Sequence, residues 1–251
     1  MSGKKVFVTR SNFPESGIKK LQEKFSVCFY PQSHVCPIEY LKEYVKDVDA
    51  ILCMPPDNIN KDVLDASGSQ LKIVATMSLG FDHIDVEECQ AVFNRLLSFE
   101  VARVFYYDIA EPVRKVEEKG AMKKRFDDLL QNSDYVIVTC NMTEENKGMF
   151  DKKAFSLMKQ SAVFINVSRG ALVEQQDLIE ALKNNQIRAA GIDVMYPEPL
   201  PKDHELLKLP NIVVTPHTAG VEETSLEEYS SVAAENIIRV LEDQSPLTPV
   251  S

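Results

Sequence analysis

The chain has 251 residues, enough for one large domain or two modest ones with a substantial core. Its hydrophobic content of 44% and charged content of 26% are ordinary for a globular protein. The net charge of -10 argues against a nucleic-acid-binding surface, which needs clustered Lys and Arg, and no apolar run approaches the length of a membrane span.

The cysteines are odd in number and form no C-x-x-C pair, so we expect reduced thiols, most of them buried, rather than a disulfide framework. They are Cys28, Cys36, Cys53, Cys89 and Cys140. The N-terminal residues MSGKKVFVTR lead directly into a strand-like run without a signal-type apolar segment. We therefore expect a cytoplasmic protein.

Apolar runs alternate with amphipathic segments along the first 85 residues, which predicts parallel βαβ construction. Strands are predicted at 5–9, 27–30, 49–53 and 72–78. Helices are predicted between them at 16–25, 38–47 and 60–67. The segment LGFDHID at 79–85 then turns the chain at the carboxyl end of the fourth strand.

A second series of the same kind begins near Ala91, with a helix predicted at 91–100. Further strands are predicted at 103–108, 134–140, 162–168, 189–195 and 211–217. Helical segments are predicted at 113–133, 153–158, 174–185 and 225–243. The fold class is therefore α/β, with two doubly wound parallel-sheet domains.

Three charged or titratable residues each stand just past the end of an apolar run: Arg169, Glu198 and His217. Taken singly, they could be a surface ion pair, a turn residue and a buried histidine. The carboxyl ends of parallel strands share one edge, however, and ligands bind at that edge. Together the three fit reduction of a 2-oxo acid, with Arg169 holding the substrate, His217 donating a proton and Glu198 orienting the histidine.

From about Asp127 to Gly220 the chain resembles the D-isomer-specific 2-hydroxyacid dehydrogenases, in particular the glyoxylate/hydroxypyruvate reductases. The phrases that carry this resemblance are DDLLQNSDYVIVTCNMT, FINVSRGALVEQQDLIEALKNNQIRAAGIDVMYPEPLP and HELLKLPNIVVTPHTAG. Residues 4–88 also resemble the first half of the family's substrate domain.

The resemblance places the catalytic arginine, glutamate and histidine on the same three residues, and it implies no metal ligand. It implies substrate-carboxylate binding by the backbone amides of Leu79 and Gly80. Cofactor contacts are implied at Asn141, Val167, Asp193 and Ala219. The implied domains are a substrate domain of residues 1–88 with 218–251 and a truncated dinucleotide-binding domain of residues 89–217.

The family's Gly-x-Gly-x-x-Gly turn is missing from this sequence, in which no two glycines are spaced as Gly-x-Gly. The chain is joined near Cys89 to Ala91, where the family carries a further stretch with that turn and the first, central strand of the nucleotide domain. We therefore expect that domain to rearrange, to close up around another strand or to be unstable alone. We also expect weak dinucleotide binding, because the turn and the following helix start bind the pyrophosphate.

The predicted strand 103–108 ends in Asp108, where an acid would bond the ribose hydroxyls of NAD(H) and repel a 2′-phosphate. Ile109 follows where an NADP-binding enzyme would place a basic residue. These two candidate cofactor-binding residues favour NAD(H), whereas NADP(H) is used by many reductases that the chain resembles.

Two functions remain open on the sequence. The first is an oxidoreductase acting on a small 2-oxo or 2-hydroxy acid. The alternative is a catalytically impaired shortened form with an association or regulatory role only. The resemblance implies a homodimer, but the missing stretch carries much of the family's dimer contact surface, which argues against one here. Nothing in the chain favours the family's corepressor branch, and we expect no nucleic-acid or membrane partner.

Overall fold

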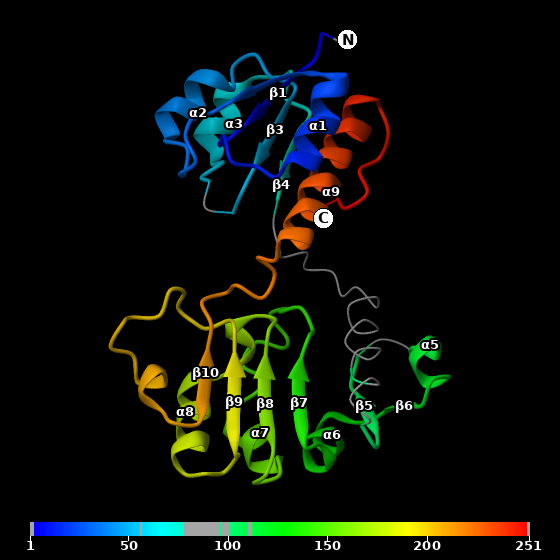
Figure 1. Ribbon diagram of the computed structural model, residues 1–251, viewed down its shortest axis with the longest axis vertical. Coiled ribbons are helices and arrows are strands. Elements are labelled where there is room, and N and C mark those ends of the chain that lie inside the picture. Colours follow the sequence, from blue (N-terminus) through cyan, green and yellow to red (C-terminus); the bar gives the residue numbers. More distant parts are fainter. Residues whose placement is uncertain (1–2, 56, 78–95, 97–100, 110–111, 250–251) are drawn as a thin grey trace. The chain divides into compact units, whose positions relative to one another are not determined.

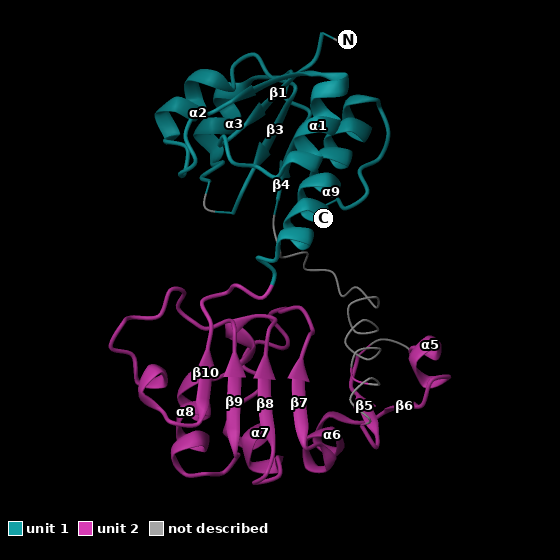
Figure 2. Ribbon diagram, in the orientation of Figure 1, with its two compact units in different colours: residues 1–80, 220–251 teal, residues 81–219 magenta. Residues whose placement is uncertain are grey.

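The computed structural model describes residues 3–55, 57–77, 96, 101–109 and 112–249. Their contacts divide the chain into two compact units (Figure 2). Unit 1 comprises residues 1–80 with 220–251, and unit 2 comprises residues 81–219. The substrate-binding and cofactor-binding roles of the two domains stay predictions. The predicted helix at 91–100 lies almost entirely outside the described residues.

Unit 1 is built on a four-stranded parallel sheet with the order β2-β1-β3-β4 (Figure 1). The strands are β1 (Lys5–Val8), β2 (Ser26–Phe29), β3 (Ala50–Cys53) and β4 (Ile73–Thr76). The helices are α1 (Glu15–Lys24), α2 (Ile38–Tyr44), α3 (Lys61–Ser67) and α9 (Glu223–Leu241). The C-terminal helix thus returns to the sheet with which the chain began.

Helices cover both faces of this sheet because successive strand side chains point to opposite sides. Val6 and Val8 of β1 belong to a core shared with α1 and α9. Phe7, between them, belongs to a second core with Leu41 of α2 and Val63 of α3. The predicted α/β class with parallel sheets is confirmed.

One buried carboxylate joins the loops that follow three strands of unit 1. Asp57 accepts hydrogen bonds from Thr9 Oγ1 at 2.5 Å, Met54 N at 2.9 Å and Cys36 N at 3.4 Å. Its Oδ1 also forms an ion pair with Arg10 Nη2 at 2.6 Å, and the Asp57 side chain has no exposed surface. Such a pair tolerates the loss of neither partner, because the remaining charge would be buried alone.

Unit 2 contains a second four-stranded parallel sheet, with the order β10-β9-β8-β7. The strands are β7 (Tyr135–Val138), β8 (Val163–Asn166), β9 (Ala189–Ile192) and β10 (Ile212–Val214). The helices are α6 (Phe126–Asn132), α7 (Lys152–Leu157) and α8 (Gln175–Lys183), with short 3-10 turns η1 (Gly170–Leu172) and η2 (Glu205–Lys208). One apolar core joins these strands and helices.

The segment 113–133, predicted to be a helical connection, is instead interrupted by a strand. Helix α5 (Arg114–Glu117) stops before Gly120, which has a φ of 99°, and β6 (Ala121–Lys123) pairs in parallel with β5 (Val104–Tyr106). A glycine adopts this backbone angle at little steric cost and so ends the helix. The prediction of helix throughout this segment was wrong because it passed over that glycine.

The β5-β6 pair forms a sheet of its own. Among the described residues, β7 is hydrogen-bonded only to β8, so the larger sheet has not closed up around another strand. Aromatic side chains make the connection instead, since Tyr107 after β5 contacts Phe126 with ring centroids 5.3 Å apart. Phe126 in turn contacts Phe150, 5.4 Å away.

The cysteines within the described residues are free thiols. Cys36 and Cys53 are buried, and burial raises their pKa to about 12 and about 11. Cys28 is exposed, so the expected burial is wrong at that position. None of the described helices is long and apolar enough to cross a membrane.

We predict that Asp57→Ala lowers the free energy of unfolding of unit 1 by about 3–5 kcal/mol, because it leaves Arg10 buried without its ion-pair partner. Urea unfolding followed by circular dichroism measures the loss. Asp65→Ala is the control: its ion pair with Lys61 is exposed and should contribute less than about 1 kcal/mol. Equal losses in the two variants would contradict the prediction.

Candidate active site

The three candidate catalytic residues follow successive strands of the larger sheet in unit 2. Arg169 comes after β8, Glu198 lies in the loop after β9, and His217 comes after β10. Since β8, β9 and β10 are parallel neighbours, their carboxyl ends lie at one edge of the sheet (Figure 1). This is the edge at which open α/β sheets bind ligands.

His217 and Glu198 are in direct contact. His217 Nδ1 lies 2.9 Å from Glu198 Oε2, and both side chains keep about a third of their surface exposed (38% and 35%). The other carboxylate oxygen, Oε1, accepts a hydrogen bond from Met195 N at 2.9 Å. The carboxylate therefore holds the imidazole by Nδ1, which directs Nε2 to a partner outside this pair.

The backbone of His217 is held in an unusual conformation by Asp193. His217 has a φ of 54°, and its N–H donates to the Asp193 carbonyl at 2.7 Å. The Asp193 carboxylate accepts hydrogen bonds from the Thr215 hydroxyl, from Thr218 N at 2.9 Å and from Ala219 N at 2.9 Å. One buried aspartate thus organises the whole loop that carries the histidine.

Two opposing influences act on the pKa of Asp193. Burial is the largest single influence and raises the pKa. The hydrogen bonds from Thr215, Ala219 and Thr218, together with the proximity of His217, lower the pKa by more in total. The net pKa lies below the ordinary value of 3.8. Asp193 is therefore a carboxylate at neutral pH, as its role as a triple acceptor requires.

Arg169 is held in a short turn at the end of β8. Its Nη1 donates to the Ser168 carbonyl at 2.8 Å. The Ser168 hydroxyl donates to the Cys140 carbonyl, which links this turn to the loop after β7. The Asn166 side chain stabilises the turn through two hydrogen bonds, since it accepts from Ser168 N and donates to the Arg169 carbonyl.

Gly170 sets the distance between the Arg169 turn and the Glu198 loop. A Cβ atom at this position would overlap the backbone of Met195, chiefly its carbonyl. Only glycine allows the two loops to approach so closely. Because Met195 N also donates to Glu198, the contact brings the arginine turn against the segment that holds the carboxylate.

The structure places the other predicted residues as follows. Asn141 and Val167 lie on the loops after β7 and β8, and Ala219 lies beyond His217, so these three share the candidate edge. Asp108 and the largely exposed Ile109 follow β5, on the separate sheet. Leu79 and Gly80 lie outside the described residues. The cofactor and substrate contacts of all these residues remain predictions.

The sequence alone did not predict the roles of Asn166, Gly170 and Met195, whose contacts hold the three loops in place. A signal existed for the first two: an asparagine ends the otherwise apolar run VFIN, and a glycine follows the arginine directly. Met195 acts through its backbone, so its residue type carried no signal.

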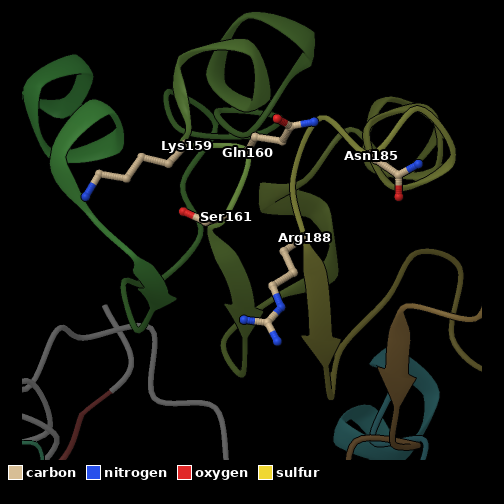
Figure 3. A pocket seen from close by; sticks show the side chains of 5 residues that line it. All are labelled: Lys159, Gln160, Ser161, Asn185 and Arg188. Atoms are coloured by element: carbon tan, nitrogen blue, oxygen red, sulfur yellow. The ribbon is translucent and has the colours of Figure 1, made fainter.

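A shallow hollow lies elsewhere, at the amino ends of β8 and β9 (Figure 3). It is lined by Lys159, Gln160, Ser161, Asn185 and Arg188. No candidate catalytic residue borders it, so it is separate from the edge described above. Among the described residues, no group of His, Cys, Asp and Glu side chains could hold a metal ion.

Comparisons with known proteins identify related sequences. Residues 80–219 match the sequence model of a family described as D-isomer specific 2-hydroxyacid dehydrogenase, NAD binding domain. A glyoxylate reductase of Thermococcus kodakarensis is 28% identical, covering 98% of this chain and 96% of the relative. The human glyoxylate reductase/hydroxypyruvate reductase is 29% identical, covering 93% of this chain and 94% of the relative.

Solved structures show the same fold. The TT0316 protein from Thermus thermophilus superposes with a TM-score of 0.82 at 26% identity, covering 99% of this chain and 100% of that chain. A D-lactate dehydrogenase with NAD+ from Lactobacillus jensenii superposes with a TM-score of 0.74 at 21% identity, over 98% of this chain and 99% of that one.

The alignment with the Thermococcus enzyme spans 323 positions, whereas this chain has 251 residues. At least 72 positions, the difference between the two numbers, therefore have no residue here. The chain is shorter than its relatives although it extends over nearly their whole length.

We predict that Gly170→Ala destabilises unit 2 by about 1–3 kcal/mol, because the added methyl group overlaps the Met195 carbonyl and forces the two loops apart. Gly191→Ala in β9 is the matched control, since nothing lies within 4 Å of a Cβ there. Urea unfolding of both variants measures the difference. An equally small effect at both positions would show that the Gly170 contact does not hold the loops.

Proposed function

The chain belongs to the family of D-isomer specific 2-hydroxyacid dehydrogenases, and from this premise we propose that it reduces glyoxylate or hydroxypyruvate to the D-2-hydroxy acid. The observation that carries the proposal is the 2.9 Å contact between His217 and Glu198 at the strand-end edge that also bears Arg169. The names of the relatives, glyoxylate reductase and hydroxypyruvate reductase, support the substrate class.

In this proposal Arg169 binds the substrate. Its planar guanidinium can donate paired hydrogen bonds to a carboxylate or to a carbonyl oxygen, and such charge-assisted bonds are strong. The bond from Nη1 to the Ser168 carbonyl restricts rotation of the group. The backbone amides of Leu79 and Gly80, which the family resemblance implies as further carboxylate-binding groups, stay a prediction outside the described residues.

His217 is the acid–base residue. With Nδ1 held by Glu198, its Nε2 donates a proton to the ketone oxygen during reduction and accepts it again in the reverse direction. Glu198 keeps the ring in this orientation. The Asp193 carboxylate sets the backbone of the same loop.

The residues of this chain fit a nicotinamide cofactor only in part. The partly exposed Val167 at the end of β8, together with Asn141 and Ala219, is suited to the nicotinamide end, and Asp108 after β5 to the ribose of NAD(H). When bound, the cofactor supplies the hydride. The sequence contains no Gly-x-Gly turn to receive the pyrophosphate, and among the described residues β5 and β6 form a sheet separate from that of β7 to β10. NAD(H) is therefore the proposed cofactor, bound weakly, with NADP(H) as the second possibility.

The same division of the sheet favours a second candidate function. A chain that retains the acid–base residues but holds the cofactor poorly would act by association or regulation rather than by turnover. This chain lacks residues that the Thermococcus enzyme has, which is as consistent with this alternative as with a reductase. A homodimer is a proposal in either case.

We predict that the protein reduces glyoxylate with NADH, and that His217→Gln lowers kcat by about 10²–10⁴-fold, because the proton donor is lost. Loss of NADH absorbance measures turnover. His34→Gln is the control, since His34 is exposed in unit 1, where its ring contacts the neighbouring Val35 carbonyl at 3.0 Å and the Tyr30 ring. A flat trace from folded wild-type protein at saturating NADH would rule out the enzyme and leave the second candidate.

We also predict that the dissociation constant for NADH lies well above the micromolar range, because the chain lacks the pyrophosphate turn. Isothermal titration calorimetry measures it, with the Lactobacillus jensenii D-lactate dehydrogenase as the positive control. A thermal-shift series with NADH and NADPH compares the two cofactors, since a bound ligand raises the midpoint by mass action. Micromolar binding would mean that another part of the chain receives the pyrophosphate.

A further inference from the structure

Asn166 is a buried polar residue at the end of an apolar strand. It closes β8, whose other residues are Val163, Phe164 and Ile165, and it is only 1% exposed. A buried amide must have its hydrogen bonds satisfied, and an aliphatic residue would pack at this position without that requirement. A polar residue that breaks the local pattern in this way points to a role beyond packing.

Both ends of the Asn166 amide are used within the next three residues. Oδ1 accepts from Ser168 N at 3.1 Å, and Nδ2 donates to the Arg169 carbonyl at 2.9 Å. The oxygen faces an N–H and the nitrogen faces a carbonyl, so the amide orientation satisfies both partners. One side chain therefore closes the turn on both sides of the Ser168–Arg169 peptide.

The backbone of Asn166 is tied to the histidine side of the site as well. Its carbonyl accepts from Asp193 N at 2.9 Å, and Asp193 holds the loop of His217. Asn166 therefore lies between the segment that carries the arginine and the segment that carries the histidine. A shift of its side chain would move the first segment relative to the second.

The direction of the Arg169 side chain depends on this turn. Its Nη1 donates to the Ser168 carbonyl, and that carbonyl belongs to the peptide that lies between the two backbone groups bonded by the Asn166 amide. Gly170, the next residue, rests against Met195 and cannot follow a movement of Arg169. If the Asn166 hydrogen bonds were lost, we therefore expect the resulting movement of the turn to displace Arg169 itself.

We propose that Asn166 is a positioning residue, which aims the Arg169 guanidinium at the substrate through the two hydrogen bonds of its amide. The inference rests on the proposed function, because it assigns substrate binding to Arg169. It adds a residue that touches neither substrate nor cofactor and still determines substrate affinity.

The test is Asn166→Asp, which has nearly the same shape but replaces the donor to the Arg169 carbonyl by a carboxylate oxygen. We expect the KM for glyoxylate to rise between about tenfold and a hundredfold, as for a misplaced binding group, while kcat changes by less than about threefold. A role in stability alone would lower the unfolding midpoint without raising this KM.

Asn211→Asp is the matched control. Asn211 Nδ2 donates to the backbone carbonyls of Leu182 at 3.1 Å and Arg188 at 3.4 Å, at the opposite edge of the same sheet. It therefore loses the same kind of bond far from Arg169. We expect a lower unfolding midpoint with an unchanged KM for glyoxylate.

Crystal structures of the wild type and of Asn166→Asp separate the inference from the proposed function. If the wild type turns over glyoxylate and Asn166→Asp has the same KM, the inference is wrong while the function stands. If the wild type does not turn over, the function fails, and the position of the Arg169 guanidinium decides the inference. The same position in both structures would overturn it, and a displaced guanidinium would support it.

Discussion

The candidate site depends on one close backbone approach, that of Gly170 to the carbonyl of Met195. Two loops that leave neighbouring parallel strands would ordinarily be kept apart by their side chains. The absence of a Cβ on Gly170 removes that barrier and lets the turn after β8 rest on the segment after β9. Arg169 stands immediately before the contact, and Glu198 is bonded to the N–H of Met195 itself. The separation of the Arg169 turn from the Glu198 loop is thus set by backbone atoms, which move less than side chains do.

A second buried group completes the arrangement on the side of β10. The Asp193 carboxylate takes three hydrogen bonds from the loop 215–219, and its carbonyl takes the N–H of His217. These bonds compensate for the left-handed backbone conformation of His217, which a residue with a Cβ adopts only when its surroundings require it. The imidazole can then meet Glu198 at 2.9 Å. Two interactions therefore hold the three loops: the close contact between Gly170 and Met195, and the hydrogen bonds to the Asp193 carboxylate.

The two sheets of unit 2 separate the candidate catalytic residues from Asp108, one of the proposed cofactor-binding residues. Arg169, Glu198 and His217 follow β8, β9 and β10, whose ladder is continuous. The described part of the sheet ends at β7, and β5 with β6 stands apart, joined through aromatic rings instead of ladder hydrogen bonds. The three candidate catalytic residues can therefore keep their geometry in a chain that lacks the pyrophosphate turn. Family membership follows from the match of residues 80–219 to the family's sequence model, and weak cofactor binding is proposed from the missing turn.

The sequence by itself determined the alternation of strands and helices, because period-two and helical apolar patterns report which faces are buried. It also determined that Arg169, Glu198 and His217 stand at strand ends and that no Gly-x-Gly turn exists, since both are properties of residue order. Only the tertiary structure decided that β6, which follows Gly120, pairs with β5 in a separate sheet and that Asn166, Gly170 and Met195 hold the site. The reason is physical: the β5-β6 pairing and the Gly170–Met195 contact join backbone atoms of segments that come together only in the folded chain. The Asn166 amide likewise bonds to backbone groups of Ser168 and Arg169, and backbone groups are the same in nearly every residue. Asp193 illustrates both cases. Its place after β9 could be read from the sequence, whereas the three groups of the histidine loop that donate hydrogen bonds to it could be found only from the structure.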